Sequence, residues 1–161
     1  MQSVCPTDHL ETVIDKHFHE DNYYITSLGN SVNFNSPVSE EINALVEAKS
    51  ITEISFVLSD NNKIMMDALE SENFKSIRGL ENFYDKTSEP KKRTEVLRRA
   101  FHTEIPLITH YLNLKVQGLK PQLNNWFSDK VKVNAKIYLR QTNLFKEANV
   151  DLIHLEHFYL N

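Results

Sequence analysis

Polar side chains follow two predicted strands at the points where the strands end. Ser27 lies at the end of a strand predicted over residues 23–28, and Asn30 follows that strand. Ser59, Asp60 and Asn61 follow a strand predicted over residues 52–58. In open parallel sheets, ligands bind beyond the carboxyl ends of the strands. Further along the chain, the guanidinium of Arg78 would neutralise an anionic substrate. The candidate ligand-binding residues are therefore Ser27, Asn30, Ser59, Asp60, Asn61 and Arg78.

Asp60 is the only ionisable side chain at these two strand ends. A single Asp just before a helix has a more ordinary role, which is to accept a backbone N–H as the N-cap. Cys5, the one cysteine, has no Cys or His partner at the spacing of a nucleophile or redox motif, and the chain has no Gly-rich phosphate loop. We therefore predict no catalytic residue.

Histidines near both ends of the chain are of a type that zinc accepts as ligands. His17 and His19 are not one helical turn apart, and His154 and His157 share a face only if their segment is helical. This spacing argues against a local site, and we predict no metal and no cofactor. The alternative is a metal site in which His17 or His19 lies close to His154 or His157 in the folded chain.

The composition indicates one cytoplasmic domain, residues 1–161. A single cysteine and the lack of a signal-peptide pattern are typical of a reducing compartment. No apolar run approaches the roughly 20 residues that span a bilayer, so we expect no membrane partner. The formal net charge of −4 disfavours nucleic acid as a partner.

The charge is unevenly distributed along the chain. Residues 1–89 carry 6 basic and 16 acidic side chains, whereas residues 90–161 carry 12 basic and 6 acidic ones. One interpretation is that the two halves form two binding surfaces or complement each other in charge. The other is that they are two differently solvated faces of one domain.

Hydrophobic periodicity predicts the elements that position the candidate residues. A helix capped by Thr7 or Asp8 precedes the strand over residues 23–28, which we expect to resume over 32–34. Ser36-Pro37 predicts the start of a second helix, with Ser36 as its cap, that ends near Lys49. After the strand over 52–58, a third helix carries Ile64, Met65, Ala68 and Leu69.

The second half of the chain is predicted to be less regular. Residues 73–90 are predicted as an irregular polar connection, and helical patterns follow from Lys91, with a break or kink at Pro106. Residues 130–140 alternate between apolar and polar side chains, which indicates a strand. The turn residues 141–143 then predict an antiparallel hairpin, while residues 151–160 fit either strand or helix. The fold class is α/β, a three-layer domain with a small, mostly parallel sheet flanked by helices and a C-terminal antiparallel hairpin.

The central third of the chain resembles the middle of a β-class carbonic anhydrase. The resemblance rests on a strand that ends in Gly29-Asn30, the helix over residues 37–49, and an apolar strand followed by Ser59-Asp60. In that family, a strand ending in an Ala-Gly-Asn turn leads through a helix to a strand that ends in Gly-His-Ser/Thr-Asp-Cys, whose His and Cys hold zinc. Leu58 stands in place of that His and Asn61 in place of that Cys, and the family's Cys-x-Asp-x-Arg strand has no counterpart before Tyr23. The resemblance implies a metal-free relative to which none of the family's catalytic residues carries over.

Two functional hypotheses follow. The first is a non-catalytic module that acts by association, as a homodimer or with another protein. The second is a small-molecule enzyme or sensor with a polar pocket near Asp60 and Arg78. A pocket on which Asp60 and Arg78 converge favours the second hypothesis, and a filled cleft favours the first.

Overall fold

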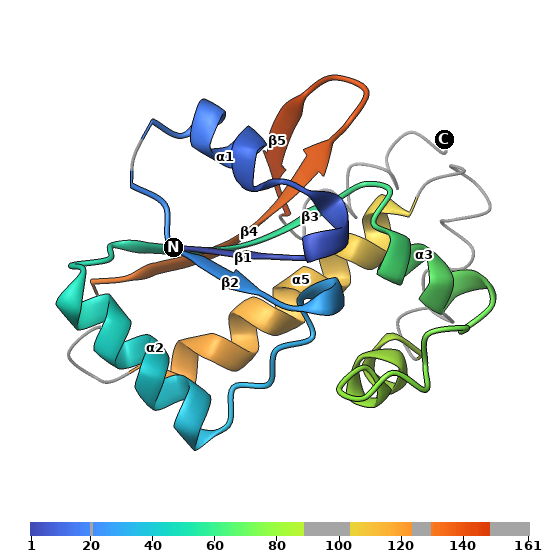
Figure 1. Ribbon diagram of the computed structural model, residues 1–161, viewed down its shortest axis with the longest axis horizontal. Coiled ribbons are helices and arrows are strands. Elements are labelled where there is room, and N and C mark those ends of the chain that lie inside the picture. The colour runs from blue at the N-terminus through green and yellow to red at the C-terminus, as the bar shows by residue number, and fades with distance from the viewer. Residues whose placement is uncertain (20, 89–103, 124–129, 149–161) are drawn as a thin grey trace, which may run out of the picture.

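The computed structural model describes residues 1–19, 21–88, 104–123 and 130–148. Within these residues the chain forms one five-stranded sheet with the strand order β2-β1-β3-β4-β5 (Figure 1). The strands are β1 (Gln2–Val4), β2 (Tyr24–Thr26), β3 (Glu53–Ser59), β4 (Lys132–Leu139) and β5 (Leu144–Glu147). The first four strands are parallel, and β5 pairs with β4 in the antiparallel direction. The predicted mostly parallel sheet and the C-terminal hairpin are confirmed.

Helices cover both faces of the sheet, which makes the predicted three layers (Figure 1). The helix α1 (Glu11–His17) lies on one face, while α2 (Ser36–Ala48) and α5 (Ile105–Leu119) lie on the other. The remaining elements are α3 (Lys63–Glu70), a helical segment at residues 81–88, and the short 3₁₀ helices η1 (Pro6–Asp8), η2 (Leu28–Asn30) and η3 (Lys120–Gln122).

Each face of the sheet has its own buried apolar cluster. Beneath α1, the buried side chains are Val4, Leu10, Ile14, Val57 and Tyr138. The larger cluster lies on the opposite face and includes Ile42 of α2, Phe56 of β3, Leu112 of α5 and Ile137 of β4. β3 is buried on both faces because it lies inside the sheet and helices cover both faces there, and this explains its nearly continuous apolar sequence.

The first strand of the sheet was missed by sequence reasoning. β1 has only three residues and pairs with β2 on one side and β3 on the other. Three residues are too few to show an alternating pattern. β1 precedes Tyr23 and is followed directly by Cys5, so the sheet has an early strand that the sequence analysis did not predict.

The predicted helix caps were displaced by one or two residues. Asn35, not Ser36, caps α2 by accepting the N–H of Val38 at 3.3 Å. Asn62, not Asp60, caps α3 by accepting the N–H of Met65 at 2.9 Å. Neither Thr7 nor Asp8 caps α1, since both belong to η1.

Three further expectations changed in the structure. Residues 32–34 form no strand, and residues 81–88, predicted as irregular, are helical. Pro106 does not kink a helix but lies in the first turn of α5, where a missing N–H costs no hydrogen bond. The helix predicted from Lys91 and the segment 151–160 lie outside the described residues.

No helix in the described part of the chain combines the length and apolar character needed to cross a membrane.

Candidate functional site

The carboxyl edge of the sheet, where β1, β3 and β4 end, is held by a buried carboxylate. Asp8 is only 1% exposed. Its Oδ2 accepts the N–H of Ser59 at 2.8 Å, and its Oδ1 accepts the Ser59 hydroxyl at 2.6 Å. Arg140 donates from Nη2 to the backbone oxygen of Asp8 at 2.7 Å and lies 3.8 Å from the Asp8 carboxylate. One acidic side chain thus joins the ends of all three strands.

Cys5 lies at the same edge, directly after β1. Its Sγ accepts the N–H of Gly29 at 3.0 Å and lies 3.0 Å from the hydroxyl of Thr7. Gly29 has a φ of 58°, and a Cβ there would approach Ile64 Cγ2 to 2.9 Å. The positive φ and the close packing of η2 against Ile64 therefore require glycine at this position.

Asn30 connects three elements from a fully buried position. Its Oδ1 accepts the Ser3 hydroxyl at 2.8 Å, and its Nδ2 donates to the Val57 oxygen at 2.9 Å. The hydroxyl of Tyr111 donates to the Asn30 backbone oxygen at 3.1 Å. Every polar group of this side chain is occupied by the protein itself, so Asn30 links β1, β3 and α5.

The structure brings three of the six candidate residues together. Ser59 and Asn61 share a hydrogen bond of 3.1 Å, and Asn61 accepts Arg140 Nε at 2.6 Å. From the described part of the chain, the Asp60 side chain accepts only the N–H of Arg140, at 3.4 Å. These bonds place the three side chains around Arg140.

The other candidates do not converge on this group. Ser27 accepts the N–H of Val32 at 3.2 Å, and Asn30, the last residue of η2, is fully buried. Arg78 is exposed between α3 and the helical segment 81–88, and it makes no hydrogen bond or ion pair with any residue that the structure describes. Ligand binding by these residues stays a prediction.

Sequence reasoning missed the groups that organise the edge. Asp8 was interpreted only as a helix cap, and Arg140 only as the outward end of an alternating strand. A buried Asp and an Arg 132 residues apart give no local signal, because their contact depends on β4 lying beside β3.

The donors described at this edge do not fit zinc. Cys5 and Asp8 are of a type that zinc accepts, but both oxygens of Asp8 accept hydrogen bonds from Ser59. Leu58 is fully buried in the apolar core, and Asn61 is bonded to Arg140. No group of three or more His, Cys, Asp or Glu side chains gathers among the described residues. His154 and His157 lie outside them, so their proximity to His17 or His19 stays a prediction.

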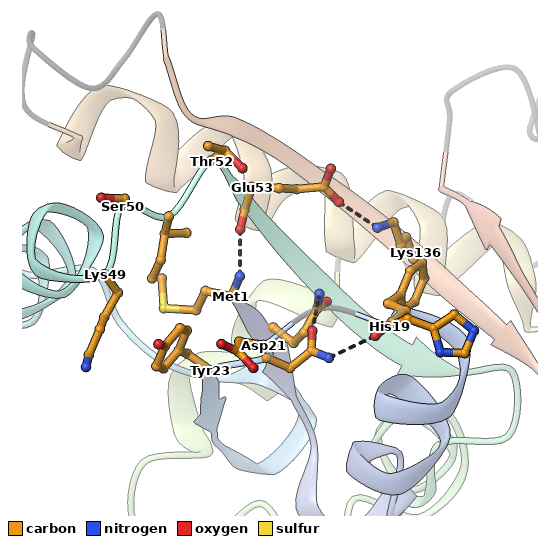
Figure 2. A pocket seen from close by; sticks show the side chains of 13 residues that line it. Met1, His19, Asp21, Tyr23, Lys49, Ser50, Thr52, Glu53 and Lys136 are labelled. Carbon is orange, nitrogen blue, oxygen red and sulfur yellow. Dashed lines mark hydrogen bonds and ion pairs between the residues drawn. The ribbon is translucent and has the colours of Figure 1, made fainter.

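A pocket lies at the opposite, amino edge of the sheet, where β1 and β3 begin. Its volume is about 500 Å³. Figure 2 shows Glu53 and Lys136 on one side of it, with Asp21 and Tyr23 facing them. The lining residues are Met1, Gln2, Phe18, His19, Asp21, Asn22, Tyr23, Lys49, Ser50, Ile51, Thr52, Glu53 and Lys136. Neither Asp60 nor Arg78 contributes to this pocket.

Glu53 is ionised and fixed in this pocket. Partial burial would raise the pKa of its carboxyl, but hydrogen bonds from Lys136, Ser55 and Asn134 and the charge of Lys136 outweigh burial and lower the pKa to about 2. The Lys136 ammonium lies 2.6 Å from Glu53 Oε1 and 4.6 Å from the centre of the Phe18 ring.

Lys115 is a buried cation for which no carboxylate partner is described. Its Nζ donates to the Val32 oxygen at 2.9 Å and faces the rings of Phe34 and Tyr111 at 5.9 and 5.5 Å. Desolvation, and to a smaller extent the charge of Lys86, lower the pKa of Lys115 to about 8. The group therefore costs stability while it is charged.

The fold is similar to that of β-carbonic anhydrases. The chain matches one of two tetrameric β-carbonic anhydrases from Sordaria macrospora at 15% identity, with a TM-score of 0.65, covering 91% of this chain and 78% of the other. It also matches the β-carbonic anhydrase CafA of Aspergillus fumigatus at 11% identity, with a TM-score of 0.62, covering 99% and 82%. No family model and no curated protein matches the sequence. At these identities the likeness establishes a shared fold.

Proposed function

We propose that this chain is a non-catalytic module with a β-carbonic-anhydrase-like fold, and that it acts by self-association. The observation that carries the first part is the network of Asp8, Ser59 and Arg140 at the carboxyl edge. Polar side chains at strand ends are where this class of sheet binds ligands. Here they bind one another, so the edge stabilises the fold instead of presenting reactive groups.

Two observations support association. The Sordaria macrospora proteins of similar fold are described as tetrameric. In this chain, Phe74 and Ile77 are 39% and 40% exposed, and the N–H of Ile77 donates to the Phe74 oxygen at 3.0 Å. This bond places both side chains on one turn, which we call the 74–77 apolar pair. We assign the pair to the contact between copies of the chain.

The first experiment is native mass spectrometry together with metal analysis of the same purified protein. We expect a dimer or higher oligomer, no stoichiometric zinc and no acceleration of CO₂ hydration after incubation with zinc. Stoichiometric zinc with CO₂ hydration would overturn the non-catalytic assignment, and a monomer at all concentrations would overturn association.

Replacement of the 74–77 apolar pair tests the surface itself. The double variant Phe74→Ser/Ile77→Ser is expected to shift the mass to the monomer while circular dichroism stays unchanged. Leu144→Ser is the matched control, because Leu144 is a 51% exposed leucine on β5. If the double variant keeps the oligomer, the pair is not at the contact; if the control alone dissociates it, the contact lies along β5.

A further inference from the structure

The floor of the amino-edge pocket is built from side chains of three adjacent strands. Gln2 of β1 is in register with Ser55 of β3, and Ser55 is in register with Asn134 of β4. Residues in register point to the same face of a sheet, so these polar side chains form one row. Glu53 lies two positions before Ser55 and points to the same face.

The hydrogen bonds of Glu53 are concentrated on one of its two oxygens. Oε1 accepts from Lys136 Nζ at 2.6 Å, from the Ser55 hydroxyl at 2.9 Å and from Asn134 Nδ2 at 3.2 Å. Among the residues that the structure describes, Oε2 accepts no hydrogen bond and has only the Nζ of Lys132, an exposed side chain, at 4.0 Å. The carboxylate is therefore held rigidly by one oxygen while the other is open for a further donor.

Two more oxygens in this row have no donor among the described residues, namely Gln2 Oε1 and Asn134 Oδ1. The orientation of both amides follows from their partners. Asn134 turns its nitrogen to the Glu53 carboxylate. Gln2 turns its nitrogen to Asn22 Oδ1 at 3.4 Å, and Asn22 turns its own nitrogen to the Asp15 carboxylate at 3.1 Å. The groups left over are therefore acceptors, and they strengthen the negative potential beneath Glu53.

The cation on the floor of the pocket, Lys136, already donates its hydrogen bonds to the protein. Lys136, whose side chain is 12% exposed, donates to Glu53 and to the Ser55 hydroxyl and faces the Phe18 ring. The main-chain N–H of Lys132 likewise donates to the Thr52 oxygen at the pocket rim. The lining also contains the Lys49 ammonium, 5.7 Å from the centre of the Tyr23 ring, and the Met1 ammonium, which donates to the Glu53 backbone oxygen at 2.7 Å. Around the Glu53 carboxylate itself, unfilled acceptors are described on Glu53, Gln2 and Asn134, which favours a ligand that donates hydrogen bonds there.

We infer that the amino-edge pocket binds a small organic cation, a primary ammonium or a guanidinium, whose N–H groups donate to Glu53 Oε2. The volume of about 500 Å³ suits a small molecule. Asp21, which lines the wall facing Glu53, provides a second carboxylate for a ligand with two cationic ends (Figure 2). This site is independent of the proposed self-association, since neither residue of the 74–77 apolar pair lines the pocket.

The test uses agmatine, which carries both an ammonium and a guanidinium, and glutarate as an anion of similar length. Binding to the full chain is measured by titration in ¹H–¹⁵N NMR spectra, with calorimetry for affinity. We expect saturable shifts with agmatine that centre on Glu53, Tyr23 and Lys136, and none with glutarate. Glu53→Gln is expected to weaken agmatine binding at least about tenfold, because a hydrogen bond to a carboxylate becomes one to a neutral amide.

Two further variants make the test specific. Glu147→Gln is the matched control: Glu147 pairs with the same Lys132 at 3.6 Å but does not line the pocket, so binding should stay within about twofold. Thr52→Trp fills the pocket from its exposed rim without removing any of the floor contacts, and it should abolish binding. If Glu53→Gln does not fold, Thr52→Trp alone tests whether agmatine binds in the amino-edge pocket.

Three results would overturn the inference. They are the absence of saturable agmatine binding to the unaltered chain, preferential binding of glutarate, and agmatine binding that persists in Glu53→Gln or Thr52→Trp. None of these results bears on the oligomeric mass, so failure of this inference is distinguishable from failure of the proposed function.

Discussion

Replacement of Asp8 by alanine should destabilise the fold strongly, because Asp8 holds the carboxyl edge together. The substitution removes the acceptors of the Ser59 N–H and the Ser59 hydroxyl, at 2.8 and 2.6 Å. Ser59 is fully buried, so its amide would lose its only described acceptor away from bulk water.

The magnitude follows from these two bonds. Each hydrogen bond to a charged group contributes about 1.5–3 kcal/mol. The ion pair with Arg140 adds little, since the Arg140 side chain is 39% exposed. Water entering the space of the lost carboxylate recovers part of the loss, and we expect a decrease of about 4 kcal/mol in the free energy of unfolding.

The assay is urea unfolding at pH 7 followed by circular dichroism, for Asp8→Ala, Ser59→Ala and the double variant. Ser59→Ala removes one bond and keeps the amide contact, so it should cost about 2 kcal/mol. The double variant should cost less than the sum of the single variants by about 2 kcal/mol, because the two residues act on the same contact. If Asp8→Ala does not fold, Asp8→Asn keeps one acceptor oxygen and serves in its place.

Asp60→Ala is the matched control at the same edge. Asp60 accepts one N–H at 3.4 Å and is not a helix cap, so its removal should change stability by about 0.5 kcal/mol or less. A loss below about 1 kcal/mol in Asp8→Ala, with no coupling to Ser59, would refute the structural role of the network. The Asp8 carboxylate would then be available for a ligand.

Two other substitutions test buried features of the fold. The pKa of Lys115 falls from 10.5 to about 8 on folding, so the folded state loses this proton at a lower pH than the unfolded state does. The free energy of unfolding should therefore rise by up to about 3 kcal/mol between pH 8 and 10.5. Lys115→Met should lack this rise in unfolding experiments from pH 7 to 9.5, and an equal rise in both proteins would contradict the assignment. Gly29→Ala should lower the free energy of unfolding by about 2–4 kcal/mol, because φ is 58° and the new Cβ would lie 2.9 Å from Ile64 Cγ2 and 3.0 Å from Phe83 Cε2. A thermal melt unchanged from that of the parent chain would show that η2 can move away from Ile64 without cost.

The sequence by itself determined the elements that have a long local pattern. The helix α2, the strand β3 and the hairpin of β4 and β5 were all predicted, with ends within about one residue for α2 and β3. In α2, β3 and β4, apolar side chains recur or run together over seven or more residues, and turn residues separate β4 from β5. The α/β class with three layers follows from the order of these elements. The resemblance to β-carbonic anhydrases was also present in this segment, and it agrees with the fold of the two solved structures.

Only the tertiary structure decided where polar groups meet. β1 is too short to show a period and exists because β2 and β3 pair with it on both sides. The Asp8 contact with Ser59 spans 51 residues, and the Glu53 contact with Lys136 spans 83. Neither contact can be recognised from a local sequence pattern, since each depends on which strands become neighbours in the sheet. For the same reason, sequence reasoning placed a pocket at the carboxyl edge, whereas the described cavity lies at the amino edge, where α1 leaves part of the polar face of the sheet uncovered.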